Sequence, residues 1–169
     1  QALVAEARLG PRRVTLAFPT TYYNDAGLAV QLLCRRHGVD DAERLVVVHD
    51  ELDLPPGQMK LKQGGGNGGH NGLKDIQAQL GSPNFWRLRL GIGHPGVKSE
   101  VAAYVLRKPP AVERLSIDHT VDESLRCLDL MLDGAMDKAM MKRALVAAGI
   151  PVTLTLHDEQ DTGFSCDPN

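Results

Sequence analysis

Two short runs rich in apolar residues lie near the start of the chain. Residues 3–8 and 14–18 have the pattern of two strands, and Gly10 and Pro11 between them favour a tight turn. This stretch predicts a β-hairpin. Apolar residues then recur at helical spacing, which predicts a helix from about Asp25 to Arg36 with Asn24 as its N-cap.

In the middle of the chain, stretches with the pattern of a strand alternate with stretches that have the apolar spacing of a helix. The apolar, β-branched run Leu45–Val48 is typical of a strand that is buried on both faces of a sheet. Further strands are predicted at 59–62 and 86–92, with a helix between them that ends at Gly81. Strands and helices that alternate in this way favour an α/β fold.

The last third is helical in pattern and ends in a polar tail. A short helix is predicted at 99–106, a long one from about Ala111 to Leu132, and another at 137–148. Residues 157–169 are acidic and are expected to be mobile. We therefore predict a single three-layer domain over residues 1–156, with a mixed, mostly parallel twisted sheet flanked by helices.

Composition limits the classes of protein that the chain can belong to. At 169 residues and 43% hydrophobic, it is long enough to bury one sizeable core. No apolar run approaches the roughly 20 residues that span a bilayer, so a soluble protein is expected. Three cysteines, without the paired spacing of a zinc or redox motif, favour reduced thiols in a cytoplasm.

The net charge of -2 conceals a strong asymmetry along the chain. Residues 54–108 carry 8 basic and 2 acidic side chains, whereas residues 109–169 carry 5 basic and 11 acidic ones. A local basic surface on an otherwise acidic protein suits the binding of one polyanion at one site. On charge alone, a solvated charged face is the more frequent meaning of such a distribution.

Residues 64–72 contain six glycines and lead directly into the predicted helix. Glycines let a backbone approach a ligand closely, and a helix N-terminus offers free N–H groups to an anion. The loop lacks the Lys-Ser/Thr ending of a P-loop and the spacing of a dinucleotide-binding turn. Phosphate binding and a flexible connection are both open for this loop alone.

Four titratable residues follow the predicted strand at 45–48: His49, Asp50, Glu51 and Asp53. Carboxylates gathered at such a point can shift one another's pKa, orient a histidine or hold a metal. They can equally serve as turn and cap residues. A metal site is the less favoured interpretation, because no second carboxylate cluster with ligand spacing occurs in the chain.

Taken together, four stretches of the chain resemble the bacterial peptidyl-tRNA hydrolases. They occur in the family's order and spacing, and the resemblance covers about residues 3–145. The stretches are Pro19–Gly27, Val48–Pro55, Gly64–Leu73 and Phe85–Pro95. Four ordered motifs are far more specific than any one of them.

The resemblance implies catalytic roles for three residues. Asp50 corresponds to the carboxylate that orients the family's catalytic histidine and stabilises its charged form. Asn71 corresponds to the amide that binds substrate and steadies the attacking water or the developing oxyanion. His70 corresponds to the neighbour that supports it.

The resemblance also implies contacts to the tRNA. Tyr22 and Asn24 correspond to contacts with the acceptor end and the adjoining peptide, and Tyr23 stands where the family usually has Met. Lys62 and Arg89 correspond to a basic pair that grips the 5′-phosphate of tRNA. Both lie in the basic segment, so the charge distribution and the resemblance agree.

The implied reaction is hydrolysis of the ester between a peptide and the terminal ribose of its tRNA, recycling tRNA from stalled translation. A base-activated water and an amide-lined oxyanion site suffice for it, so neither a metal nor a cofactor is expected. The implied partner is peptidyl-tRNA, bound at its acceptor stem, 5′-phosphate and 3′ end. A cytoplasmic monomer without an obligate protein partner is expected.

The chain departs from the family at both ends. Family members open with a buried strand, a Gly-Asn-Pro-Gly turn and the histidine that acts as general base, and none of these is recognisable here. None of the six histidines stands in that context, and we expect an upstream segment to supply it. The acidic tail also differs from the basic or neutral ending usual in the family.

Two other functions are compatible with parts of this sequence. A non-catalytic RNA-binding relative, similar to the plant plastid factors that assist intron splicing, would keep the basic pair and lose hydrolysis. A nucleotide-binding metabolic enzyme that uses the glycine loop is disfavoured, because the loop matches neither nucleotide fingerprint.

Overall fold

The computed structural model describes residues 1–147, with side chains described for residues 1–142. The chain separates into two compact units, one formed by Gln1–Asp122 and one that begins at Glu123. The candidate functional residues all lie in the first unit. A single domain over residues 1–156 stays a prediction.

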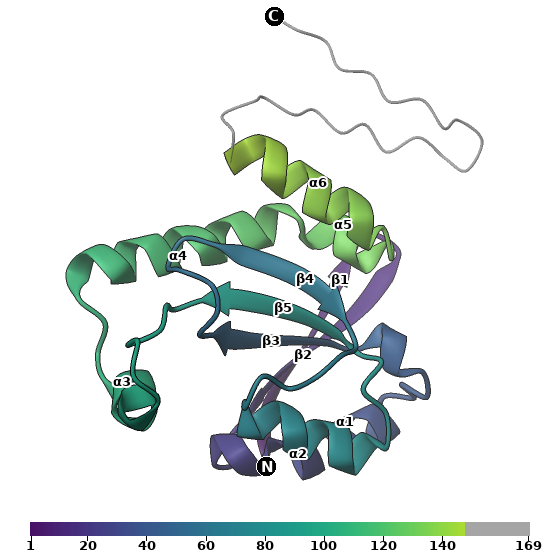
Figure 1. Ribbon diagram of the computed structural model, residues 1–169. Helices are drawn as coiled ribbons and strands as arrows, with labels where there is room; N and C mark the ends of the chain where they lie inside the picture. Colours follow the sequence, from purple (N-terminus) through teal and green to yellow (C-terminus); the bar gives the residue numbers. More distant parts are fainter. Residues whose placement is uncertain (148–169) are drawn as a thin grey trace, which may run out of the picture. The chain divides into compact units, whose positions relative to one another are not determined.

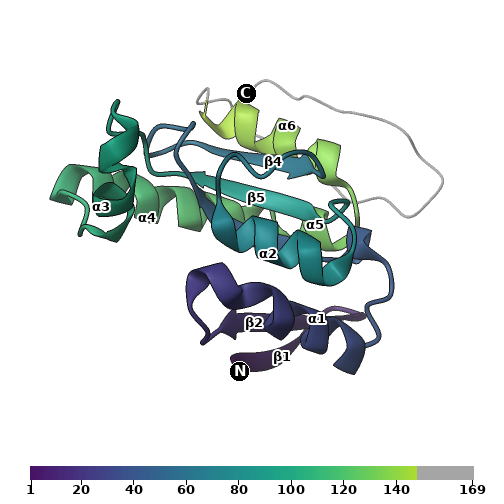
Figure 2. The same ribbon diagram turned by 60° about the horizontal axis from the view of Figure 1, so that its bottom comes forward.

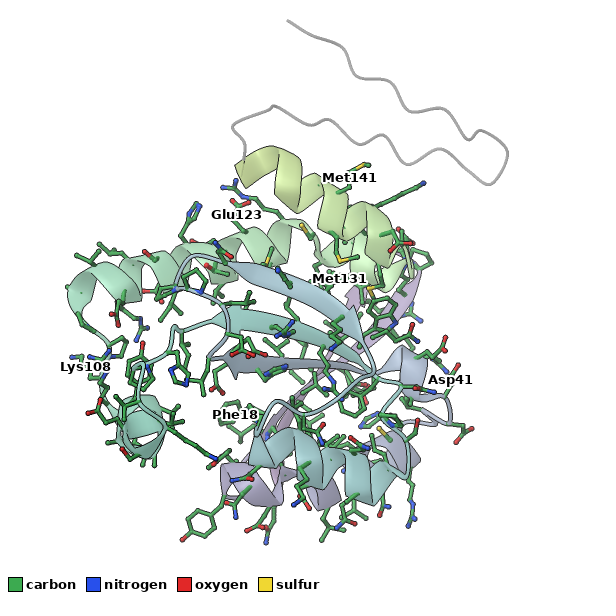
Figure 3. All side chains as sticks on the ribbon, viewed as in Figure 1. Phe18, Asp41, Lys108, Glu123, Met131 and Met141 are labelled. Carbon is green, nitrogen blue, oxygen red and sulfur yellow. The ribbon has the colours of Figure 1, made fainter. Side chains whose placement is uncertain are left out.

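The chain begins with the predicted hairpin. β1 (Ala2–Leu9) pairs antiparallel with β2 (Arg12–Pro19), and Gly10 in the turn has a φ of 61° that favours glycine. Cross-strand partners share a face, so Leu3 and Phe18 stand side by side. Both side chains are largely exposed, and Phe18 is labelled in Figure 3.

A three-stranded sheet in the order β3-β5-β4 positions the candidate site. β5 (Trp86–Gly91) is its central strand, with β3 (Val46–Glu51) parallel on one side and β4 (Met59–Gln63) antiparallel on the other. Figure 1 shows the three strands together, with the arrowheads of β3 and β5 at the same end. The α/β class and the mixed sheet are thus confirmed, although one of the two pairings in this sheet is antiparallel.

The prediction that the 45–48 strand is buried on both faces is wrong for Val48. This side chain is 58% exposed. Val48 points to the face opposite Val47, which packs against the core, and because β3 is an edge strand, only β5 flanks Val48 within the sheet. A run of valines indicates a strand that is at least partly buried, but it does not distinguish an edge strand from a central one.

Helices α1 (Ala26–Arg36) and α2 (Asn71–Leu80) lie side by side, as both views show (Figures 1 and 2). Leu73 and Ile76 of α2 form a buried core with Phe85, against which Val30 and Val47 pack. The helices therefore cover the face of the sheet that carries Val47. As predicted, α2 ends at Gly81, which adopts a left-handed φ of 68°.

Asn24 does not cap α1. It lies inside a short 3-10 helix, η1 (Tyr23–Asp25), and Asp25 takes the N-cap position without a side-chain hydrogen bond. The start of α1 is instead held from outside, because the Gly27 N–H donates to Asp75 Oδ2 at 2.6 Å. A Cβ at Gly27 would lie 2.5 Å from the Asp75 carbonyl oxygen, so only glycine permits this approach of the two helices.

The remaining elements are mostly helical, and the predicted long helix is broken. α4 and α5 are separated at Cys127, where the pattern had suggested one continuous helix. The acidic tail at 157–169 lies outside the described residues. Within residues 1–147, no helix is both long and apolar enough to cross a bilayer. The bounds are η2 (Ala42–Arg44), η3 (Lys98–Glu100), α3 (Val101–Leu106), α4 (Ala111–Arg126), α5 (Leu128–Leu132) and α6 (Met136–Ala147).

Candidate active site

The centre of the candidate site is a contact between Asp50 and His70, which are 20 residues apart in sequence. β3 ends at Glu51 and thus delivers Asp50 to the carboxyl end of the strand. The glycine loop delivers His70 to the start of α2. His70 Nε2 lies 3.2 Å from Asp50 Oδ1, so the two motifs that the sequence singled out form one site.

Both ring nitrogens of His70 are engaged. Its Nδ1 accepts a hydrogen bond from the Leu73 N–H at 3.2 Å, which caps the N-terminus of α2. A nitrogen that accepts carries no proton in the neutral ring, so Nε2 carries the proton and donates a hydrogen bond to Asp50. In this state His70 has no free lone pair for taking a proton from water.

Asp50 is held as a carboxylate. The hydrogen bond from His70 is the main cause that lowers the pKa of Asp50 below its ordinary value, and partial burial opposes it. The Asp50 side chain is 47% exposed, so part of it faces solvent. A charged, accessible acceptor at this point can orient and stabilise a group that becomes positively charged.

His49 is the buried neighbour of this pair. Its Nδ1–H donates to the Asp50 carbonyl oxygen at 2.6 Å, and its ring stands edge-on to His70 with centroids 5.1 Å apart. Its Nε2 is buried and has no hydrogen-bond partner in the described part of the chain. Burial is the main cause that lowers the pKa of His49, so the ring is held neutral.

A pH-dependent stability follows from His49. Because its pKa falls from about 6.5 in the unfolded chain to a lower value in the fold, the unfolded chain binds more protons below about pH 6.5. The stability that the neutral ring contributes is fully present at pH 7.5. The free energy of unfolding then falls from about pH 6.5 until the pH has passed through the folded pKa, by up to about 1.4 kcal/mol per pH unit. Urea denaturation between pH 7.5 and 5 should show that the free energy of unfolding falls less steeply with pH in His49→Gln than in the unsubstituted protein.

The matched control for this measurement is His119→Gln, in an exposed position on α4. It should leave the pH dependence nearly unchanged. The lowered pKa values of Asp50 and Glu51 act only in more acidic solution, so they do not enter this window. Equal slopes in His49→Gln and the unsubstituted protein would contradict the neutral, buried state of the ring.

Asn71 begins α2, beside the segment that contains the tyrosines. Its side-chain amide donates to the Tyr23 hydroxyl at 3.5 Å, a long and weak contact. Gly72 makes this proximity possible, because a Cβ there would lie 2.7 Å from the Tyr23 carbonyl oxygen. The structure thus brings Tyr23, Asn71, His70 and Asp50 together, with Tyr22 and Asn24 on either side of Tyr23.

The predicted basic pair lies on one face of the sheet. Lys62 pairs with Arg87 across β4 and β5, and Lys60 pairs with Arg89, so all four side chains share a face. His49, the β3 partner of Arg89, lies on that face too. Arg89 Nε donates to Glu51 Oε2 at 2.8 Å, which fixes the direction of its guanidinium.

Two residues at the site were missed as individual candidates. Arg87 is almost fully buried although the sequence offers no acidic partner at helical or strand spacing. The available signal was the strand pattern of residues 86–91, which places Arg87 and Leu88 on opposite faces of the strand. In the sheet, Arg87 shares its face with Val47. His49 was recognised only as one member of the acidic cluster.

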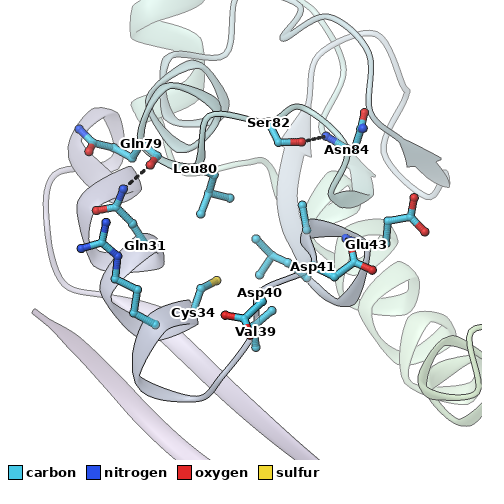
Figure 4. A pocket seen from close by; sticks show the side chains of 13 residues that line it. Gln31, Cys34, Val39, Asp40, Asp41, Glu43, Gln79, Leu80, Ser82 and Asn84 are labelled. Carbon is cyan, nitrogen blue, oxygen red and sulfur yellow. Dashed lines mark hydrogen bonds between the residues drawn. The ribbon is translucent and has the colours of Figure 1, made fainter.

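A cavity of about 370 Å³ lies away from these residues, at the amino end of β3. Figure 4 shows its wall, with Cys34 and Asp40 beside it and a hydrogen bond from Gln31 to the Gln79 carbonyl across one side. Ligands of α/β sheets usually bind beyond the carboxyl ends of the strands, the end at which Asp50 lies. Among the described residues, no group of three or more His, Cys, Asp or Glu side chains is placed to hold a metal ion.

Comparison with known proteins gives concordant matches. The family model described as peptidyl-tRNA hydrolase matches residues 1–148. The chain is 58% identical to the peptidyl-tRNA hydrolase of Leptothrix cholodnii, over 84% of this chain and 71% of the relative. It is 56% identical to that of Edwardsiella ictaluri, over 80% of this chain and 69% of the relative. The crystal structure of peptidyl-tRNA hydrolase from Acinetobacter baumannii matches with a TM-score of 0.80 at 39% identity, covering 84% of this chain and 71% of that one.

Proposed function

The chain belongs to the peptidyl-tRNA hydrolase family, and we propose that it hydrolyses the ester of peptidyl-tRNA around Asp50, His70 and Asn71. The observation that carries this assignment is the contact of 3.2 Å between His70 and Asp50 at the start of α2. It joins a carboxylate, a helix N-terminus and a side-chain amide at the carboxyl end of a parallel strand. We also propose that the protein works in the cytoplasm, where peptidyl-tRNA is formed.

Asp50 orients and stabilises the general base that takes the proton from the attacking water. Because His70 fills one carboxylate oxygen, the rest of the carboxylate can accept a hydrogen bond from a second donor. A base oriented in this way becomes positively charged in the transition state, and the Asp50 charge stabilises it. His70 serves as a support that fixes the carboxylate rather than as the base itself.

Asn71 stabilises the negative charge that develops on the carbonyl oxygen of the ester. An amide N–H₂ group is a donor, and its partner Tyr23 binds it only weakly at 3.5 Å. The amide can therefore turn to an oxyanion without breaking a strong bond. The positive end of the α2 dipole adds to this stabilisation.

The basic face of the sheet receives the tRNA. Lys62 is exposed. Arg89 binds Glu51 through its Nε, so its two terminal nitrogens can donate to a phosphate. Paired donors of this geometry suit the terminal 5′-phosphate of an acceptor stem. Tyr22 is 81% exposed and Tyr23 58%, so both rings can contact the 3′ end or the peptide, with Asn24 beside them.

A single assay tests the function as a whole. The natural gene product should release the peptide from an N-blocked aminoacyl-tRNA and should leave the same tRNA with a free amino group largely intact. Tight binding of tRNA without release would favour the RNA-binding alternative, for which the comparisons give no support.

Replacing Lys62 tests the proposed tRNA contact. Lys62→Ala should weaken the binding of uncharged tRNA by up to about fivefold and lower the slope of log Kd against log salt by about 1. At saturating substrate, kcat should stay near that of the unsubstituted protein. Fluorescence anisotropy at several salt concentrations provides both quantities.

Arg36→Ala is the matched control, because Arg36 is an exposed cation at the far end of α1. Its slope should be unchanged. A loss of kcat in Lys62→Ala at saturating tRNA, with the salt slope retained, would rule out a phosphate contact for this lysine.

A further inference from the structure

Arg87 is a buried cation in the central strand of the sheet. It lies on β5 between Val47 of β3 and Lys62 of β4, and its exposure is 2%. Taking a guanidinium out of water is costly unless its donors are well paired. Burial, followed by the charge of Arg89, lowers the pKa of Arg87, which is consistent with that cost.

The partners of Arg87 are backbone carbonyls of the glycine loop. Its Nη1 donates to the Gly66 carbonyl oxygen at 2.7 Å, and its Nη2 donates to that of Gly65 at 3.0 Å. A longer bond of 3.4 Å reaches Asn67 Oδ1, and the guanidinium lies 4.8 Å from the centre of the Phe85 ring. Glu51, the acidic residue that the three strands place on this face, pairs with Arg89.

The glycine loop needs such an external support. Gly64, Gly65, Gly68 and Gly69 all have positive φ values, and residues 64–66 have no side chains that could fix the loop. Beyond the Arg87 contact, the Asn67 carbonyl accepts from the His70 N–H at 2.8 Å. An unbroken series of contacts therefore runs from Arg87 through the loop to His70 and Asp50.

We propose that Arg87 is a positioning residue for hydrolysis: its guanidinium clamps the carbonyls of Gly65 and Gly66 and so sets the places of His70 and Asn71. An apolar side chain would fill this position at lower cost, since buried ionic groups can often be replaced by well-packed apolar ones without loss of stability. The arginine supplies two parallel donors, which neither an apolar residue nor a lysine provides. The inference rests on the proposed function.

The test compares Arg87→Met and Arg87→Lys, with Arg36→Met as the control, in the full-length protein. Arg87→Met keeps packing against Phe85 and should fold with an unchanged or higher Tm. Its kcat should fall at least tenfold with KM within about twofold, because a small misplacement of reacting groups is expensive. Arg87→Lys should recover only part of the loss. Arg36→Met, which removes an exposed cation at the end of α1, should leave kcat, KM and Tm unchanged.

Hydrogen exchange gives a readout that does not depend on activity. Amides of residues 64–70 should exchange at least tenfold faster in Arg87→Met than in the unsubstituted protein, while amides of β5 should be unchanged. Unaltered loop exchange, or kcat within twofold in Arg87→Met, would overturn the clamp. Absence of turnover in the unsubstituted protein would refute the proposed function instead, and the exchange rates would still decide the clamp.

Discussion

Asp50→Asn is expected to lower kcat for peptidyl-tRNA hydrolysis by about 10²- to 10⁴-fold, the range over which positioned acid–base groups contribute. Asparagine keeps the size of the side chain and can still accept the hydrogen bond from His70. It loses the negative charge that the His70 contact maintains at neutral pH. The loss should therefore appear in kcat, with KM and the binding of uncharged tRNA nearly unchanged.

Asp53→Asn provides the matched control for Asp50. It removes the same charge three residues further along, at an exposed position whose N–H donates to Glu51 Oε1. Steady-state kinetics on an N-blocked aminoacyl-tRNA, with thermal unfolding to confirm folding, should find Asp53→Asn within about twofold of the unsubstituted protein. Retention of more than half of kcat in Asp50→Asn would remove this carboxylate from the mechanism.

Asn71→Ala is expected to lower kcat by about 10²- to 10³-fold, as removal of one oxyanion donor does in other acyl-transfer enzymes. Asn71→Asp should lower it at least as far, because a carboxylate has no N–H₂ donor and would repel the oxyanion. The side chain is exposed at the first residue of α2, so neither substitution disturbs the buried core. Single-turnover measurements would isolate the chemical step from product release.

Tyr23→Phe separates the two roles that Asn71 could have. If the amide served only to hold the Tyr23 hydroxyl at 3.5 Å, removing that hydroxyl would reproduce the defect of Asn71→Ala. We expect Tyr23→Phe to stay within about threefold of the unsubstituted kcat, since so long a hydrogen bond contributes little. Equal defects in both variants would assign the amide to support of the tyrosine.

Local patterns predicted most of the first unit correctly. The hairpin, α2 with its end at Gly81, and the strand β5 all follow from short-range periodicity and turn residues. These features depend on neighbours within a few residues, which a sequence displays directly. The four family motifs likewise placed Asp50 and Asn71 in one site, and the structure brings their segments together.

Other features could not be predicted because their partners are distant in sequence. Val48 has the apolar character of a buried strand, but its exposure depends on whether β3 has a second neighbour. Asn24 is a good N-cap residue by type, yet the contact of Gly27 with Asp75, 48 residues away, sets the start of α1. The break at Cys127 between α4 and α5 likewise has no signal in the apolar spacing.

The sequence by itself determined the types of element, their order, the family motifs and a basic segment that suits a polyanion. Tertiary structure alone decided that His70 donates a hydrogen bond to Asp50 and that Arg87 binds the carbonyls of the glycine loop. The physical reason is that these contacts join residues about twenty positions apart, and sheet register and loop closure set their geometry. A glycine loop can adopt many conformations, and the buried guanidinium selects the one in which the site is assembled.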